Sequence, residues 1–483
     1  MNRGKILLTA LGLTLLAGCA VGPDYQRPAT ESPDAFRRAA SDTAAAEGAV
    51  GFGDLGWWEV FEDPHLTGYI AEALTNNWDL RMAAARVLQA GAALGITRSQ
   101  FLPSVAAGGD LQAVRASERG PTPIPTGMNP QAEYGDVYAT MAAYEVDLWG
   151  RIRRASEAAR ADLLASQAAQ ETVRQTLVAE VASGYFDLLR LDYEGEIAQR
   201  TLQARTNSLA LTTAREEGGV ASMQDVAQAR ILVSTAEASI VDIARRREQQ
   251  ENALCVLLGR YPGHLERGGA LTEQPVRSEV SAGLPSALLE RRPDIRVAEQ
   301  QLVAANADIG QAKAAFFPQL TLTGLYGFQT VALSDLFTAP AQTWQFGPAV
   351  TLPLFTGGRL RGNLELARAR FDEALARYQQ TVQGAFREVS DSLIGYQRAR
   401  EYRELQVVRA QAHRDAAELA TIRYEGGVTS YLEVLYSDQE LFAAELELAR
   451  ARLNELLSVV QLYRALGGGW QAPVASEGPT PGA

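Results

Sequence analysis

The chain contains one unit of sequence twice, and this duplication limits the folds that are open to it. Residues 215–222, Arg-Glu-Glu-Gly-Gly-Val-Ala-Ser, recur at 423–430 as Arg-Tyr-Glu-Gly-Gly-Val-Thr-Ser, an offset of 208. The motifs Phe-Leu-Pro at 101–103 and Phe-Phe-Pro at 316–318 are offset by 215 instead, which indicates a change of loop length inside one copy. A Gly/Pro-rich stretch at 260–285 joins the two copies. We therefore expect two similar halves.

Each copy is predicted to contain a moderate helix, two extended segments and then two very long helices. In the second copy, apolar residues recur three and four positions apart, the heptad spacing of packed helices, at Phe371, Leu375, Tyr378, Val382, Phe386, Val389, Leu393 and Tyr396. Residues 360–423 contain no proline. They can therefore form one helix of ~60 residues, roughly 90 Å long. Such a helix needs equally long neighbours to pack against.

The extended segments are predicted to form two β-hairpins, at 104–148 and 319–354. In the second hairpin, Trp344, Phe346 and Val350 share one parity and alternate with small or polar residues. Period-two alternation with aromatic residues is typical of strands that face lipid. On this pattern alone, a pair of ordinary soluble hairpins remains an alternative.

Four strands are too few to close a barrel, because membrane barrels need about eight or more. Open strand edges are not tolerated in lipid, since their N–H and C=O groups would stay unpaired. If these strands enter a membrane, the protein must therefore be an oligomer. Two copies would supply eight strands and three copies twelve.

The N-terminus has the layout of a secretory signal. Arg3 and Lys5 precede an apolar run at 6–17 that is too short to span a membrane, which predicts a signal peptide at 1–18. The Leu-Ala-Gly-Cys sequence that ends at Cys19 resembles the bacterial lipobox. We therefore expect Cys19 to be lipidated, and acyl chains on this residue would anchor the exported chain firmly. A plain signal peptide with an incidental cysteine is the alternative.

The composition argues against catalysis and against nucleic acid as the main partner. The formal net charge is −12, whereas phosphate binding needs a basic surplus. Three histidines and two cysteines are too few for the usual zinc site or for a disulfide framework. No Ser/His/Asp arrangement stands out, and the glycine-rich runs lack the spacing of phosphate loops. We expect no enzyme activity, no cofactor and no metal, and we expect Cys255 to be a buried small apolar residue.

Several motifs together resemble one family, the TolC-like outer membrane factors, and within it the nodulation-type efflux lipoproteins. The motifs are Cys19-Ala20-Val21-Gly22-Pro23-Asp24-Tyr25 with Pro28, Trp58-Glu59-Val60-Phe61, Pro285-Ser286-Ala287-Leu288-Leu289, Arg292-Pro293-Asp294-Ile295, Phe317-Pro318 and Leu354-Phe355-Thr356-Gly357-Gly358. The doubled Gly-Gly-Val turns complete the set. The resemblance covers the chain from Cys19 to about residue 470.

The resemblance implies an α+β membrane protein that assembles as a homotrimer. Its outer-membrane β-barrel would have twelve strands, four from each chain, continued by a long α-helical coiled-coil barrel across the periplasm. Such proteins are passive exit ducts in the outer membrane that dock onto a periplasmic adaptor protein and an inner-membrane pump of the RND type. No catalytic step is implied.

The resemblance also implies which residues carry function. The family's adaptor-docking residues map onto the two turns, at Arg215, Gly218, Gly219, Val220, Arg423, Gly426, Gly427 and Val428. A periplasmic gate is expected at Asp225, Tyr424 and Glu433, where a trimer would crowd six carboxylates. Two plainer interpretations stay open. The glycines stop helices, and the acidic residues near helix starts complement the helix dipole.

The expected organisation and function follow from these points. Along the chain we expect a signal peptide (1–18), a lipidated N-terminal segment (19–63), repeat 1 (64–259, turn 218–220), a linker (260–285), repeat 2 (286–470, turn 426–428) and a disordered tail (471–483). The expected function is the outer-membrane channel of a tripartite efflux pump for drugs or other toxic small molecules. A channel for type I protein secretion and a coiled-coil spacer lipoprotein without transport are the alternatives.

Overall fold

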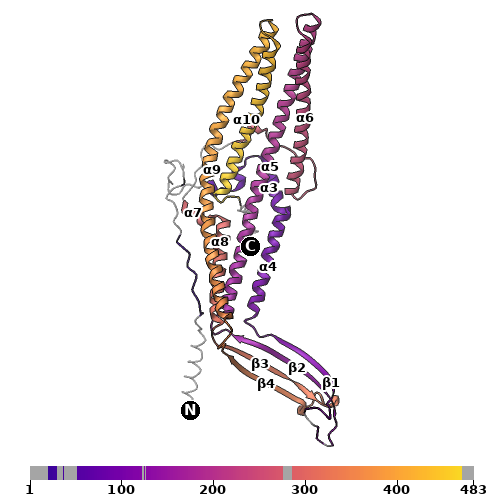
Figure 1. The fold of residues 1–483 in the computed structure, drawn as a ribbon, viewed down its shortest axis with the longest axis vertical. Coiled ribbons are helices and arrows are strands. Elements are labelled where there is room, and N and C mark those ends of the chain that lie inside the picture. Colours follow the sequence, from indigo (N-terminus) through magenta and orange to yellow (C-terminus); the bar gives the residue numbers. More distant parts are fainter. Residues whose placement is uncertain are drawn as a thin grey trace, which may run out of the picture. The chain divides into compact units, whose positions relative to one another are not determined.

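The fold repeats one order of elements twice, as the sequence predicts. The computed structural model describes residues 20–29, 36, 52–121, 124–125, 127–275 and 285–469. The first copy contains α3 (Pro64–Asn76), α4 (Trp78–Ser99), β1 (Val105–Arg115), β2 (Gln131–Val146), α5 (Arg151–Glu217) and α6 (Met223–Leu257). The second contains α7 (Pro285–Arg291), α8 (Pro293–Ala314), β3 (Gln319–Thr330), β4 (Gln342–Thr351), α9 (Arg359–Glu425) and α10 (Tyr431–Ala465) (Figure 1). The signal peptide, Cys19 and the tail 471–483 lie outside the described residues.

Short elements complete the described part of the chain. They are η2 (Phe52–Asp54) and α2 (Trp57–Val60) before α3, η3 (Leu271–Glu273) after α6, and η4 (Leu333–Asp335) and η5 (Ala339–Ala341) between β3 and β4. Asp63 caps α3 by accepting the backbone N–H groups of His65 and Leu66. Pro64 then occupies the first helical position, where its missing N–H costs nothing.

The helices α5 and α9 have the same length, 67 residues each. At 1.5 Å per residue, each is roughly 100 Å long. The heptad positions predicted from the sequence form the buried face: Tyr378 and Val389 of α9 are fully buried, as are Val181 and Tyr185 of α5. Burial of this face explains why such long helices persist, because helix propensity alone is a weak stabiliser.

The four strands form one antiparallel sheet in the order β1-β2-β3-β4. The register places Tyr138 of β2 between Gly108 of β1 and Gly327 of β3, and a Cβ on Gly327 would lie 2.3 Å from the Val137 carbonyl oxygen. The pairing of β2 with β3 joins the two copies into one sheet. Within the described residues, β1 and β4 each pair with one strand, so both outer edges of this sheet are open there.

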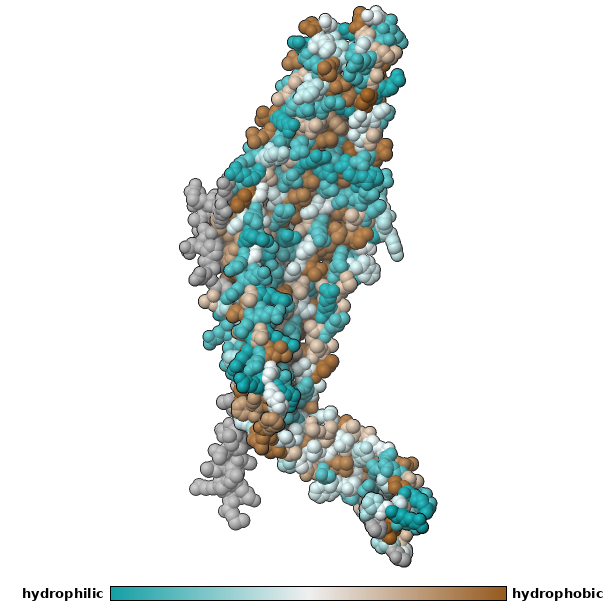
Figure 2. All heavy atoms as spheres, in the orientation of Figure 1, coloured by the Kyte–Doolittle hydropathy of each residue, from teal (hydrophilic) through white to brown (hydrophobic). Residues whose placement is uncertain are grey.

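The sheet exposes apolar side chains. Trp344 and Phe346 of β4 are each 65% exposed and Val350 is 69% exposed, all on the parity that the alternation singles out. White and brown residues cover most of the strand surface in Figure 2, while teal residues gather at the loop end of the sheet. Among the helices of the described part, none combines the length and the hydropathy that a membrane span requires.

The chain divides into two compact units, and each draws on both copies. One unit holds the sheet together with residues 20–29, 87–166 and 298–378. The other contains the remaining described residues, including the turn of each long helical hairpin. In Figure 1 the hairpins α5–α6 and α9–α10 each end in a tight turn.

Candidate functional site

Both long hairpins reverse through the same short turn. The helix α5 ends at Glu217 and α6 begins at Met223, while α9 ends at Glu425 and α10 begins at Tyr431. The glycine in the middle of each turn has a left-handed backbone, with φ of 74° at Gly219 and 72° at Gly427. Among the described residues, no atom beyond the glycine and its chain neighbours lies within 4 Å of a Cβ built at either position, so backbone conformation and not crowding selects glycine there.

The hydrogen bonds of the turns form a Schellman motif, the common way of ending a helix on glycine. The N–H of Val220 donates to the Arg215 carbonyl oxygen at 2.9 Å, and the N–H of Gly219 donates to that of Glu216 at 2.8 Å. In the second turn the matching bonds run from the N–H of Val428 to the Arg423 carbonyl oxygen (2.9 Å) and from the N–H of Gly427 to that of Tyr424 (3.0 Å). The first glycine of each turn also donates its N–H to the preceding helix, Gly218 to Ala214 and Gly426 to Ile422. The turn glycines are therefore structural residues, whatever else they do.

Each turn presents one apolar side chain to the outside. Val220 is 70% exposed and Val428 is 71% exposed. In a Schellman motif the residue after the glycine often packs back onto the helix. These two valines do not, so each leaves apolar area uncovered beside exposed backbone.

Arg215 lies against the other hairpin. Its Nη1 donates to the carbonyl oxygens of Tyr424 and Glu425, each at 3.2 Å, at the C-terminal end of α9. Its guanidinium carbon lies 4.7 Å from the centroid of the Tyr424 ring. A cation at a helix C-terminus complements the dipole, and stacking on the ring adds a cation–π contact. Arg215 therefore joins the two turns of one chain, a contact that sequence reasoning missed.

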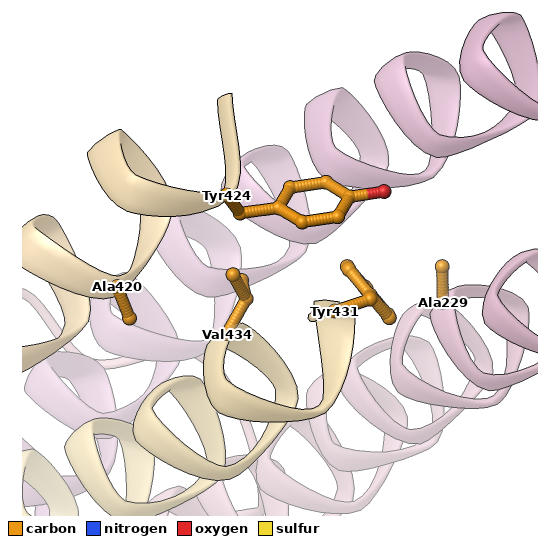
Figure 3. Close-up of a cluster of buried hydrophobic side chains, with 5 residues drawn as sticks. All are labelled: Ala229, Ala420, Tyr424, Tyr431 and Val434. Atoms are coloured by element: carbon orange, nitrogen blue, oxygen red, sulfur yellow. The ribbon is translucent and has the colours of Figure 1, made fainter. Parts of the chain in front are cut away.

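Tyr424 belongs to a small buried cluster beneath the turns. Its ring meets that of Tyr431 edge-on at 5.4 Å, and Ala229, Ala420 and Val434 complete the cluster (Figure 3). The Tyr431 hydroxyl lies 3.3 Å from the Ser208 hydroxyl on α5. The Tyr424 hydroxyl is buried and has no hydrogen-bond partner in the described part of the chain. The first turn has Glu216 at the equivalent position, so the two turns differ here.

The two predicted acidic gate residues have local partners in the single chain. The Asp225 carboxylate accepts the backbone N–H of Ser222 at 3.0 Å and its hydroxyl at 2.9 Å, forming a capping box at the start of α6. Glu433 accepts the Thr429 hydroxyl and lies 3.4 Å from Nε of Arg423. The structure thus brings together Arg215 with Tyr424, and Arg423 with Glu433, while Asp225 supports its own helix.

A buried ion pair on the same hairpins was not predicted. Arg205 of α5 is 3% exposed, and its Nε donates to Asp438 of α10 at 2.7 Å. Its Nη1 donates to the Leu232 carbonyl oxygen of α6 at 3.1 Å. Burial raises the pKa of the Asp438 carboxyl, and Arg205 acts against that rise. Arg205 lies one heptad before the buried Thr212. A heptad assignment for α5 could therefore have placed it on the packed face.

Between this ion pair and the tyrosine cluster lies a cavity of ≈ 630 Å³. Leu211, Leu232, Val434 and Leu441 form its apolar wall. Exposed residues such as Glu418 and Ile422 also line this cavity, so it is open to solvent on one side. Among the described residues, no three His, Cys, Asp or Glu side chains group together as metal ligands.

The N-terminal segment binds the unit that contains the sheet. Val21 donates its N–H to the Trp149 carbonyl oxygen at 3.0 Å, and Arg154 of α5 pairs with Asp24 at 2.8 Å. Ala20 approaches Gly150 so closely that a Cβ there would lie 2.9 Å from it. Further contacts are those of Arg27 with Glu299 (2.6 Å) and Asn306 with the Pro23 carbonyl oxygen (3.0 Å), both on α8. The residue after Cys19 is thus held at the junction of β2 and α5.

Comparisons with known proteins agree on one family. The family model described as outer membrane efflux protein matches residues 69–260 and 284–468. The toluene efflux pump outer membrane protein TtgF of Pseudomonas putida is 39% identical over 468 residues, covering 94% of this chain and 95% of that protein.

Solved structures agree with the sequence matches. The outer-membrane channel OprN superposes with a TM-score of 0.86 at 31% identity, covering 94% of this chain and 100% of that chain. The open state of the Neisseria gonorrhoeae MtrE outer membrane channel gives 0.83 at 33% identity, covering 94% and 99%.

Proposed function

This chain belongs to the outer membrane efflux protein family, and we propose that its joined turns are both the adaptor-docking tip and the periplasmic gate of the channel. The chain is the outer-membrane channel of a tripartite efflux pump, a homotrimer that works with a periplasmic adaptor and an inner-membrane pump. The open edges of β1 and β4 are paired by neighbouring chains in the trimeric barrel, which is located in the outer membrane.

The proposed cargo is drugs or other toxic small molecules, since the relatives include an efflux pump protein named for toluene. The family consists of channel proteins, and we propose that this chain has no catalytic activity of its own. Energy for export would then come from the inner-membrane pump. Selection of the cargo would lie largely with that pump too, because the channel is a passive exit path.

The observation that carries the docking proposal is the contact of Arg215 with Tyr424 and Glu425. Because Arg215 joins the two turns, each chain presents one composite tip with two exposed valines. Exposed apolar side chains beside backbone groups that are already hydrogen-bonded favour contact with a protein partner. The docking surface would comprise the turns at 218–220 and 426–428 with Arg215 and Arg423.

Replacing the exposed valines tests docking. In a strain that depends on this channel for drug resistance, Val220→Asp with Val428→Asp should abolish resistance, because charged side chains would be desolvated at the apolar contact. Trimer yield in the outer membrane should stay at the level of the parent, since neither valine packs within its own chain. The matched control is Val331→Asp, an equally exposed valine in the β3–β4 loop. Resistance that survives both substitutions would contradict docking at the turns.

We assign the gate to Asp225, Tyr424 and Glu433. All three lie on or next to the turns, and the buried Tyr424 hydroxyl lacks a partner within the described chain. A buried hydroxyl without a hydrogen bond is costly, so a rearrangement of the turns that brings the Tyr424 hydroxyl to water or to another polar group would be favoured. The capping role of Asp225 does not compete with this proposal, because a carboxylate at a helix start still carries its charge.

We also propose that Cys19 carries the lipid anchor. The contacts of residues 21–27 with Trp149, Arg154 and Glu299 bring the chain to within one residue of Cys19 at the β2–α5 junction. A lipid attached there would enter the membrane beside the barrel to which the strands belong. Radiolabelled palmitate should enter the native protein and not Cys19→Ser. A native protein that takes up no label would refute the anchor.

A further inference from the structure

The cavity beneath the two turns has the size of a small-molecule site. Its volume of ≈ 630 Å³ lies within the range of about 300–1,000 Å³ that is usual for ligand pockets. Its lining residues come from all four long helices of one chain, α5, α6, α9 and α10, and they all belong to the same compact unit. A single chain therefore supplies this lining.

The inner wall of the cavity is apolar and aromatic. Leu232 and Val434 are buried there, and so are the side chains of Tyr424 and Tyr431. The Tyr424 ring extends from α9 toward the other hairpin, beside the Tyr431 ring (Figure 3). Such a wall favours a ligand with an apolar body, because contact with it removes apolar area from water. The faces of tyrosine rings also attract cations, since they carry partial negative charge.

Two acidic side chains of the lining have no partner of their own. Glu418 and Glu425, both on α9, line the cavity and are exposed to solvent. Within the described part of the chain, neither carboxylate forms an ion pair or accepts a hydrogen bond. A molecule that enters the cavity from solvent therefore meets two carboxylates that are free to bind a positive charge.

The positive charges of the lining are already paired with acids. Arg205 pairs with Asp438 at 2.7 Å, and Arg414 pairs with Glu445, also at 2.7 Å. Pairing lowers the attraction that each guanidinium exerts on an anion, so the two arginines do not offset the free carboxylates. The charge of the cavity is therefore complementary to a cation.

We propose that this cavity binds a hydrophobic cation, a molecule with an aromatic or alkyl body and one ammonium or phosphonium centre. The apolar body lies against Leu232, Val434 and the tyrosine rings, and the cationic centre lies near Glu418 and Glu425. The same carboxylates repel an anion of equal shape. Because the ligand contacts both hairpins of one chain, its binding stabilises the folded protein. This site depends on neither the docking proposal nor the gate proposal.

Two ions of equal shape and opposite charge, tetraphenylphosphonium and tetraphenylborate, test the selection by charge. In equilibrium dialysis against the purified full-length trimer, with detergent alone as the background, the cation should bind saturably and at least tenfold more tightly than the anion. Glu418→Gln with Glu425→Gln should weaken binding of the cation about tenfold, because both free charges are gone. The matched control is Glu237→Gln with Asp372→Asn, two exposed acids outside the lining, and it should bind as the parent does. Equal affinity for the two ions, or an unchanged affinity in the glutamate variant, would overturn the proposal.

Filling the cavity tests where the cation binds. Ala417 is a small residue of the lining, so Ala417→Phe would place a ring in the space and should abolish saturable binding of tetraphenylphosphonium. Ala416→Phe, at an exposed alanine outside the lining, is the matched control and should keep it. The cation should also raise the thermal unfolding midpoint of the parent and not that of Ala417→Phe. Saturable binding to an intact Ala417→Phe trimer would overturn the assignment to this cavity. If Ala417→Phe does not form trimers, the variant of Glu418 and Glu425 still decides.

Discussion

At the residue scale, several charged side chains of this protein are partly buried, so the packing around each of them shifts its pKa. Asp308 on α8 is half-buried. Burial raises the pKa of its carboxyl, the nearby Asp162 raises the pKa further, and Arg370 acts in the opposite direction. No catalytic use is needed to explain such a shift, because desolvation alone disfavours a carboxylate.

Asp308→Asn should stabilise the protein at neutral pH. A raised pKa means that the folded state binds more protons than the unfolded state, so stability falls as pH rises from the ordinary value of 3.8 through the raised one. At pH values above the raised pKa, the parent carries a desolvated charge that destabilises its folded state, whereas the uncharged amide of the variant does not. The thermal unfolding midpoint of Asp308→Asn should therefore exceed that of the parent at pH 7.5. This difference between the two midpoints should disappear at acidic pH.

The control for this substitution is Asp372→Asn, which removes an exposed carboxylate from α9. Circular dichroism at 222 nm on the detergent-solubilised trimer, recorded across the pH range, provides the midpoints. If the midpoints of Asp308→Asn and the parent differ by the same amount at every pH, the charge of Asp308 is not the cause of the difference.

At the element scale, the long helices and the strands could be predicted because each pattern has one dominant physical cause. A run of 67 residues with heptad spacing and no proline has no stable alternative to a helix, and Gly219 and Gly427 mark where each helix must reverse. The alternation of Trp344 and Phe346 likewise marked an exposed strand face. Both patterns involve residues that are close in sequence, so they can be recognised without any knowledge of the fold.

The contacts between elements could not be predicted in the same way. Arg215 is predicted to lie at the docking tip, but the sequence does not show that its guanidinium also lies on Tyr424 of the other hairpin. Arg205 and Asp438 are 233 positions apart in sequence, and nothing local states that they meet. Long flexible side chains reach several neighbours, so only the packed arrangement of helices decides which neighbour they meet. The cross-hairpin contacts are therefore what the structure adds to the candidate site.

At the scale of the whole molecule, two properties arise only when the chains assemble. The open sheet edges become hydrogen-bonded, and acidic side chains of different chains come close together. One chain leaves two sheet edges open, and the trimer pairs them. The same threefold copying multiplies Asp225 and Glu433 into six carboxylates near the turns. In the single chain Asp225 completes the capping box of α6 with Ser222, and Glu433 lies beside Arg423, so each acid has a local partner. In the proposed gate, any effect of the charges on transport would come from their repetition in three chains.

The acids should make the channel favour cations and narrow its entrance. Like charges brought close together bind cations, and bound divalent ions would bridge neighbouring chains. Asp225→Asn with Glu433→Gln keeps hydrogen-bonding oxygens at both positions and removes all six charges. In planar bilayers this double variant should lose most of its preference for potassium over chloride. Block by millimolar Mg²⁺ should weaken about tenfold, because two attractive charges per chain are gone.

Asp225→Ala separates the charge of this residue from its capping role. It removes the side-chain half of the capping box as well as the charge, while the Ser222 cap itself remains, so it should lower the thermal unfolding midpoint by more than Asp225→Asn does. If selectivity follows the number of charges and the midpoint follows the cap, the two roles of Asp225 are distinct. Unchanged selectivity and unchanged Mg²⁺ block in the double variant would remove both acids from the gate, and the constriction would then depend on Tyr424 and the packing of the turns alone.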